Sequence, residues 1–102
     1  PATQNDLKTY EFKSNILLGG SILSPDRIVV TDSQVIYKKR NKYLIGTDES
    51  SIPFSRISSV EIDRKLIDSD IIIYSTGNQT IIAGDFSIGD AKKIKKIIEE
   101  RI

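Results

Sequence analysis

The chain has 102 residues, of which 38% are hydrophobic and 28% charged, a composition typical of one small soluble domain. It contains no cysteine, histidine or tryptophan. This excludes thiol nucleophiles, disulfides and thiolate metal sites, and it removes both the usual base near neutral pH and the commonest zinc ligand. We therefore expect a binding protein rather than an enzyme, with no metal site, cofactor or catalytic residue.

The sequence also limits the setting and the partners. No apolar run approaches the roughly 18 residues that cross a bilayer, and the first residues lack a secretory signal pattern. We therefore expect a cytoplasmic protein, with peripheral membrane contact as an alternative. The formal net charge of +1 carries no nucleic-acid signature.

Charge is unevenly distributed along the chain. Residues 37–42 (YKKRNK) carry four cations, and residues 92–102 carry five cations against two acids. Between them, residues 43–91 contain eight acidic side chains against three basic ones. The positive charge thus falls into two pools, separated by an acidic stretch.

The first quarter of the chain predicts a lead-in followed by a strand. Residues 1–14 show no convincing period and are expected to be a tail or lead-in, so that the domain spans 15–102. The segment 15–23 (NILLGGSIL) predicts the first strand, and Gly19-Gly20 within it indicates a bulge or bend.

Short β-branched runs then alternate with turns, which is typical of an all-β domain. RIVVT (27–31) and QVIYKK (34–39) flank Asp32-Ser33 and predict a compact hairpin. A looser excursion follows over 41–51. Further strands are predicted in SSIPF (50–54), RISSVEIDRK (56–65), DIIIYS (70–75) and TIIAG (80–84).

Two details of the last strands are also predicted. Gly77-Asn78 is expected to supply the positive φ angles of a hairpin turn. The triplet Ile71–Ile73 breaks alternation, so this strand is expected to be covered on both faces.

The period changes at the end of the chain. In SIGDAKKIKKIIEERI (87–102), Ser87 and Asp90 resemble a capping box at the start of an amphipathic helix of three to four turns. The residues that recur at helical spacing are Ala91, Ile94 and Ile98, flanked by Ile97 and Ile102. This stripe is expected to cover the open side or end of a sheet.

Seven strands closed by one C-terminal helix resemble the pleckstrin-homology (PH) superfold, and most closely the bacterial PH-like domains. The resemblance covers about residues 15–102 and is carried by RIVVTDSQVIYKK, IPFSRISSVEI, the two Ile-rich strands and DFSIGDAKKIKKII. It implies a mainly β, PH-like barrel of two nearly orthogonal sheets, plugged at one end by the helix. The loops between strands 1 and 2, 3 and 4, and 6 and 7 would gather at the other end.

In eukaryotic relatives this open end binds phosphoinositide headgroups through Lys and Arg on strands 1 and 2. The corresponding segment here is LSPDRIVV, in which Asp26 stands beside Arg27. The inositol-phosphate pattern is absent.

Two surfaces are candidates for binding. An anion site would use Arg27, Lys38, Lys39, Arg40 and Lys42, because Arg forks onto phosphate or carboxylate and Lys supplies point charges. The alternative, which we favour, is a solvated hairpin tip whose lysines discourage edge-to-edge pairing. A partner surface on the helix would use Lys92, Lys93 and Lys96.

The acidic residues around the predicted turns lack the spacing of a calcium loop and are assigned to turn chemistry and capping. The favoured function is a non-catalytic PH-like domain for protein–protein contact or self-assembly, as a homo-oligomer. The alternative is peripheral binding of anionic lipid or another anionic ligand through the loop between strands 3 and 4.

Overall fold

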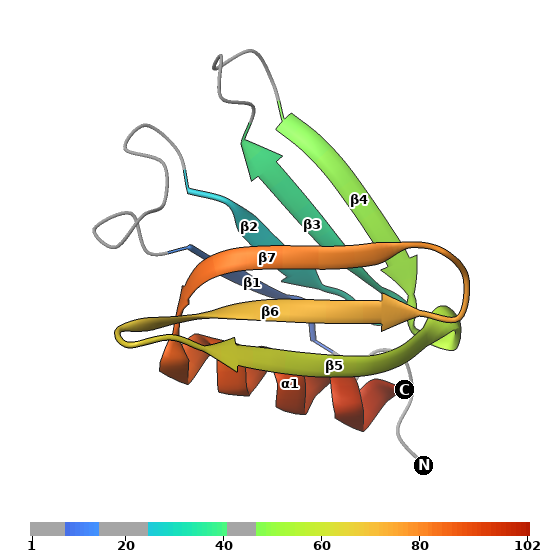
Figure 1. Cartoon of the computed structure of the whole chain (residues 1–102). Coiled ribbons are helices and arrows are strands. Elements are labelled where there is room, and N and C mark those ends of the chain that lie inside the picture. Colours follow the sequence, from blue (N-terminus) through green and yellow to red (C-terminus); the bar gives the residue numbers. More distant parts are fainter. Residues whose placement is uncertain (1–7, 15–24, 41–46) are drawn as a thin grey trace.

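The computed structural model of the chain describes residues 8–14, 25–40 and 47–102 (Figure 1). The predicted order of about seven strands followed by one C-terminal helix is confirmed. The elements are β1 (Tyr10–Lys13), β2 (Arg27–Val30), β3 (Gln34–Arg40), β4 (Thr47–Pro53), the 3-10 helix η2 (Phe54–Arg56), β5 (Ile57–Arg64), β6 (Asp68–Ser75), β7 (Thr80–Ser87) and α1 (Ile88–Arg101).

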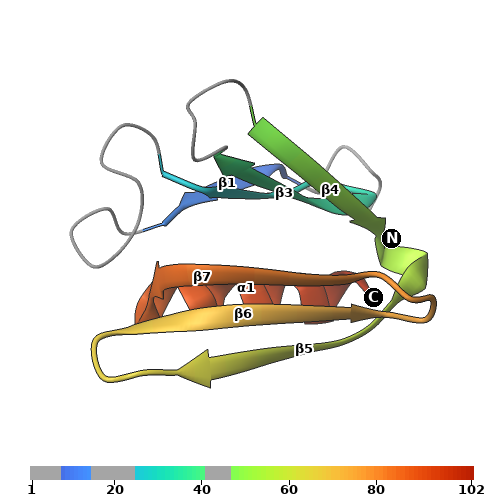
Figure 2. The ribbon, with the colours of Figure 1, turned by 45° about the horizontal axis from the view of Figure 1, so that its top comes forward.

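The strands form two antiparallel sheets, one in the order β1-β2-β3-β4 and the other in the order β5-β6-β7. Both views place the four-stranded sheet and α1 on the same side of the three-stranded sheet (Figure 1, Figure 2). The opposite side of the three-stranded sheet is its outer face, and no element in the described part of the chain covers it. The layers are PH-like, and the described strands do not hydrogen-bond into one closed barrel.

The core lies between the two sheets and α1, where alternate residues of each strand point inward. In β6, Ile71 and Ile73 are fully buried, whereas Ile72 between them is only half-buried. The prediction that this strand is covered on both faces is therefore wrong. The buried apolar residues are Ile28, Val30, Val35, Tyr37, Ile52, Phe54, Ile57, Val60, Ile71, Ile73, Ile81, Ala83, Phe86, Ala91, Ile94 and Ile98.

Helix α1 begins and packs as its sequence predicts. The hydroxyl of Ser87 accepts a hydrogen bond from the backbone N–H of Asp90 at 3.1 Å, which satisfies one free donor of the first turn. Ala91, Ile94 and Ile98 are buried in the core. Each buried isoleucine contributes about 1.5–3 kcal/mol, so this stripe holds the helix against the sheets.

The last turn of α1 is tied to the four-stranded sheet. The guanidinium of Arg101 donates to the carbonyl of Thr31 at 2.6 Å and to the carbonyl of Lys8 at 2.7 Å. It also lies 5.6 Å from the ring centroid of Tyr10, within cation–π range. One side chain at the helix end thus joins the start of β1 to the end of β2.

Two strand boundaries differ from the prediction. β1 lies at Tyr10–Lys13, inside the predicted lead-in, so that interpretation is wrong for these residues; the predicted strand at 15–23 lies outside the described residues. β4 already begins at Thr47, because its first half pairs along the whole end of β3. Asp48 and Glu49 therefore belong to an edge strand and not to a loose excursion.

The resemblance implies one end of the molecule for the turn between β6 and β7. In the structure this turn lies at the opposite end. The N–H of Thr76 donates to the carbonyl of Arg56 at 2.8 Å, and the N–H of Phe54 donates to the carbonyl of Ser33 at 3.0 Å. This turn therefore lies with η2 and the β2–β3 turn, because consecutive antiparallel strands alternate their ends. The prediction of positive φ angles at Gly77 and Asn78 is also wrong, because neither residue adopts a positive φ in this four-residue turn.

Candidate functional site

The strand register brings two residues of the predicted anion site together and adds a third. Arg27 lies directly opposite Lys38 on β3, and on its other side opposite Lys13 on β1. Directly paired residues of antiparallel strands share one face of the sheet. These three cations therefore form one row across the outer face of the four-stranded sheet. Lys13 was missed because it falls in the predicted lead-in.

Acidic residues accompany this row. Glu11 lies 4.0 Å from Arg27, and both side chains are largely exposed, so this ion pair contributes little. Lys38 stands opposite Glu49, and Lys39 opposite Asp48. These two lysines of β3 are thus matched by acids on β4, which lowers the net charge available to an anion.

The remaining predicted anion-site residues are not brought into the row. Lys39 alternates with Lys38 along β3 and so points to the opposite side of the sheet. Arg40 ends β3, but its side chain, like the whole of Lys42, lies outside the described residues. An anion site at this end of the sheet stays a prediction.

The predicted partner surface on α1 is exposed. Lys92, Lys93 and Lys96 all point to solvent, and none forms an ion pair with another described residue. Lys92 and Lys93 lie in the first half of the helix, where the macrodipole disfavours cations by at most about 0.3–1 kcal/mol each, and Lys96 lies just past the middle. Glu100 follows Lys96 at i+4 and offsets part of this charge, so the described chain leaves the surface with an excess of positive charge.

A second charged surface covers the outer face of the three-stranded sheet, and the sequence analysis did not predict it. Register places Glu61, Ile72 and Ile82 in one row across β5, β6 and β7, and Asp63 opposite Asp70 in the next. The Tyr74 hydroxyl donates to Glu61 at 3.2 Å on the same face. We call this surface the acidic face; it comprises Glu61, Asp63, Asp68, Asp70, Asp85, Ile72, Tyr74 and Ile82.

The acidic face has an apolar component that is exposed to solvent. Ile82 is 63% exposed on the edge strand β7. In the turn between β5 and β6, Leu66 and Ile67 are 95% and 61% exposed. Two adjacent aliphatic side chains are thus exposed at a turn tip, and a third exposed aliphatic residue lies farther along the sheet, opposite Ile72.

A β-bulge shapes the end of the acidic face next to this turn. Two residues of β7, Gly84 and Asp85, stand opposite the single residue Asp70. Asp85 has φ 67°, a left-handed conformation that Asp tolerates better than most residues. Its N–H donates to the Asp70 carboxylate at 3.2 Å. A Cβ on Gly84 would lie 3.1 Å from that carboxylate, so glycine leaves the room for this contact.

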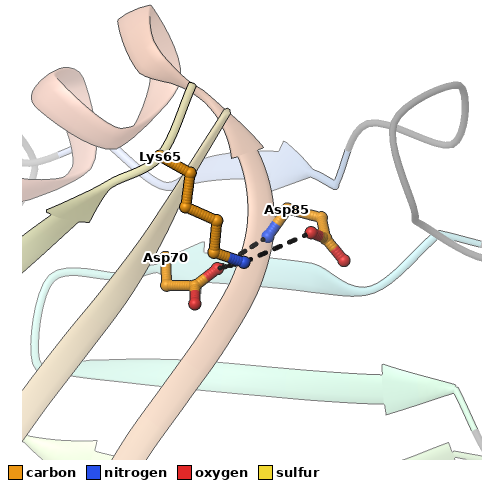
Figure 3. Close-up of polar contacts among 3 residues, drawn as sticks. All are labelled: Lys65, Asp70 and Asp85. Atoms are coloured by element: carbon orange, nitrogen blue, oxygen red, sulfur yellow. Dashed lines mark hydrogen bonds and ion pairs between the residues drawn. The ribbon is translucent and has the colours of Figure 1, made fainter. Parts of the chain in front are cut away.

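Lys65 bridges the two carboxylates of the bulge. Figure 3 shows its ammonium directed toward Asp70, at 2.9 Å, and Asp85, at 3.8 Å. The hydrogen bond to Asp70 raises the pKa of Lys65 above its ordinary value. This contact anchors the turn that carries Leu66 and Ile67, together with the 2.9 Å backbone hydrogen bond from Lys65 to Asp68.

Asp85 lies in a crowded cluster of carboxylates, and its pKa is raised. Burial raises the pKa of its carboxyl, and the hydrogen bond and the negative charge of Asp68 raise it further, against the opposing charge of Lys65. At this carboxyl, Lys65 therefore does not outweigh burial and the neighbouring Asp68 together. The acidic stretch of the sequence signalled the excess of negative charge, but only the register shows that it gathers on one face.

Tyr37 belongs to the core side of the four-stranded sheet. Its hydroxyl donates to the Asp26 carboxylate at 3.1 Å, and burial, followed by the charge of Asp26, raises the pKa of the phenol. Asp26 in turn exchanges hydrogen bonds with Ser14, through its backbone carbonyl and N–H, each at 2.9 Å. These bonds fix the strand ends beside the β1–β2 connection.

Comparison with known protein families decides what this arrangement is. The family model described as "Bacterial PH domain" matches residues 3–100. The chain belongs to the bacterial PH domain family. No curated protein matches the chain.

Membership confirms the family to which the sequence was compared and makes this bacterial PH domain an interaction domain of the PH type. The match begins before β1, which agrees with the pairing of Tyr10–Lys13 to β2. Within the described residues, no helix of this domain is long and apolar enough to cross a membrane. The same residues contain no group of three or more side chains arranged to hold a metal ion.

Proposed function

We propose that this bacterial PH domain is a non-catalytic module that works through protein–protein contact, and that its partner is a further copy of itself. The absence of histidine and cysteine favours binding over catalysis. The observation that carries the proposal is the outer face of the three-stranded sheet, which no described element covers. A monomer gains nothing by holding Leu66 and Ile67 in water on an anchored turn, whereas a contact that buries them would be stabilised.

Self-association is tested by light scattering on a concentration series of the wild-type protein. We expect the average mass to rise above that of a monomer as the concentration increases. The variant Leu66→Ser/Ile67→Ser removes two exposed apolar side chains from a turn without opening the core. Since each buried aliphatic side chain contributes about 1.5–3 kcal/mol, this variant should weaken association at least tenfold.

The control for this variant is Ile102→Ser. Ile102 is also a large exposed aliphatic residue, at 50%, but it follows the last turn of α1, away from the acidic face. It should associate like the wild type. A wild-type chain that stays monomeric at the highest concentrations, or equal weakening by both variants, would contradict self-assembly through this face.

A second candidate function is favoured by the row of Lys13, Arg27 and Lys38. Three cations on adjacent strands suit an anionic membrane surface, where each contributes about 1 kcal/mol near the lipid. Cosedimentation with vesicles that contain phosphatidylserine tests it. The variant Arg27→Glu/Lys38→Glu should lose binding at low salt; binding that is insensitive to this change, or to added salt, would exclude the row as the contact.

A further inference from the structure

We propose that the acidic face of one copy binds the lysine-bearing side of α1 in the next copy, in a head-to-tail contact. This inference rests on the proposed self-assembly and names the surface that the acidic face meets. Its two halves are Glu61 and Asp63 on one copy, and Lys92 and Lys96 on the other.

The acidic half has more negative charge than the described residues of its own chain offset. The acidic face contains five carboxylates, and Lys65 forms the described ion pairs with two of them, Asp70 and Asp85. Glu61 and Asp63 are both exposed and form no ion pair with a described residue. Arg64 follows them but alternates away from this face along β5. The crowding that Asp68 imposes on Asp85 is a further sign of excess negative charge.

The basic half has the opposite imbalance. Lys92, Lys93 and Lys96 are exposed on the side of α1 that faces away from its buried stripe. Lys92 and Lys93 stand in the N-terminal half of the helix, where the macrodipole disfavours cations. Acidic side chains brought against them would offset both this unfavourable position and the mutual repulsion of the lysines.

One copy cannot bring its own two surfaces together. In Figure 1 the helix lies behind the three-stranded sheet, and Figure 2 also places α1 on the same side as the four-stranded sheet. The acidic face lies on the opposite side of the three-stranded sheet, because its residues alternate with the buried ones. The buried stripe of Ala91, Ile94 and Ile98 fixes this orientation and turns the lysines away from the sheet. A second copy can satisfy both surfaces.

The contact joins two different surfaces, so it leaves one of each free on every dimer. It is therefore heterologous, and repetition produces a closed ring or an open chain. Ile82, Leu66 and Ile67 supply apolar area around the carboxylates, and the methylene stems of the lysines can cover such area while their ammonium groups reach the acids. Charge complementarity then sets the orientation of the partner.

The test is a charge exchange between the two surfaces, read by sedimentation velocity. The sheet variant is Glu61→Lys/Asp63→Lys, and the helix variant is Lys92→Glu/Lys96→Glu. These residues are exposed and lie outside the β-bulge, so both variants should fold, as circular dichroism will verify. Each variant alone opposes like charges, and we expect each to weaken self-association at least about tenfold.

Restoration distinguishes this contact from a general charge effect. An equimolar mixture of the two variants again pairs opposite charges, and so does a single chain that carries all four substitutions at an unchanged net charge. Both should recover association. The control Asp32→Lys/Asp48→Lys has the same charge change as the sheet variant but lies on the other sheet, and it should associate like the wild type.

The outcomes separate this inference from the proposed function. If the wild type associates and neither charge variant changes it, the head-to-tail contact is wrong while self-assembly stands. If both variants dissociate but neither the mixture nor the four-fold variant recovers, the pairing of these two surfaces is wrong. If the wild type is strictly monomeric, self-assembly itself fails and the contact fails with it.

Discussion

The two sheets of this bacterial PH domain differ in how charged residues are paired on their outer faces. On the four-stranded sheet, Lys38 stands opposite Glu49 and Arg27 lies beside Glu11, so each cation has an acid nearby. On the three-stranded sheet, Asp63 stands opposite Asp70, and like charges are set side by side. Cross-strand pairing stabilises the first pattern and disfavours the second. An uncompensated face is thus the better candidate for a partner, although the longest run of basic residues lies on the other sheet.

We expect the largest effect on stability from the buried stripe of α1, because the helix packs against the core that both sheets share. Ile94 is fully buried on α1, between the two sheets. Ile94→Ala should lower the free energy of unfolding by about 2–5 kcal/mol, measured by urea titration, because it removes buried methyl groups and leaves a cavity. Ile102→Ala, at the exposed end of the helix, is the control and should stay within about 0.5 kcal/mol of the wild type. Similar losses from both would show that α1 does not form the common support.

The next effect concerns the two carboxylates that stand opposite one another on the acidic face. Asp70→Ala removes the acceptor of the Asp85 N–H and the closest partner of Lys65. Because the part-buried N–H then lacks a partner, we expect a loss of about 1–3 kcal/mol of unfolding free energy. Asp63→Ala, on the exposed neighbour, should change stability by less than about 0.5 kcal/mol. The comparison would be refuted if the two substitutions were equally costly.

The elements with a local signal could be predicted from the sequence. The helix follows from the spacing of its isoleucines and from Ser87, and the β2–β3 hairpin follows from two β-branched runs around a two-residue turn. β1 was missed because four residues without alternation carry no periodic signal. Asp48 and Glu49 were assigned to a loop because charged residues are typical of loops.

The candidate site was harder to predict than the fold, because it depends on register. Glu61, Asp70 and Asp85 are dispersed over 25 residues of sequence, and nothing local indicates that they share one face. The bulge at Asp85 inserts an extra residue, which no alternation pattern signals. Register also decides that Lys38 meets an acid, and therefore how much charge the YKKRNK run presents.

One substitution on the four-stranded sheet removes the pairing of a cation with an acid. Glu49→Lys removes the acid opposite Lys38 and extends the cationic row onto β4. With about 1 kcal/mol for each cation near an anionic surface, binding to phosphatidylserine vesicles should strengthen about fivefold or more at low salt, measured by cosedimentation. Asp32→Lys makes the same charge change in the β2–β3 turn, at the other end of the sheet. Equal strengthening by both variants would mean that net charge, and not the row, determines binding.

The smallest effect tests the charge excess of the acidic face through pH. Folding raises the pKa of Asp85 above its ordinary value, so the ionised carboxyl opposes folding. The unfavourable contribution of Asp85 to stability develops as the pH rises from about 4 through the raised pKa and is complete at neutral pH. Asp85→Asn removes this charge while keeping a side chain that tolerates the left-handed conformation.

Urea titrations between pH 3.5 and 7 measure this contribution. At pH 7 the Asn variant should have the higher free energy of unfolding, and the difference should shrink toward zero as the pH falls to about 4, where the wild-type carboxyl is protonated. Asp85→Gly should show the same pH dependence, since glycine also adopts positive φ. Its free energy of unfolding should differ from that of the Asn variant by a pH-independent amount, which comes from the conformational freedom of the backbone. A difference between wild type and Asn variant that does not change with pH, or a wild type that is more stable at pH 7, would mean that Lys65 neutralises the cluster. The bulge would then add no excess charge to that of Glu61 and Asp63 on the acidic face.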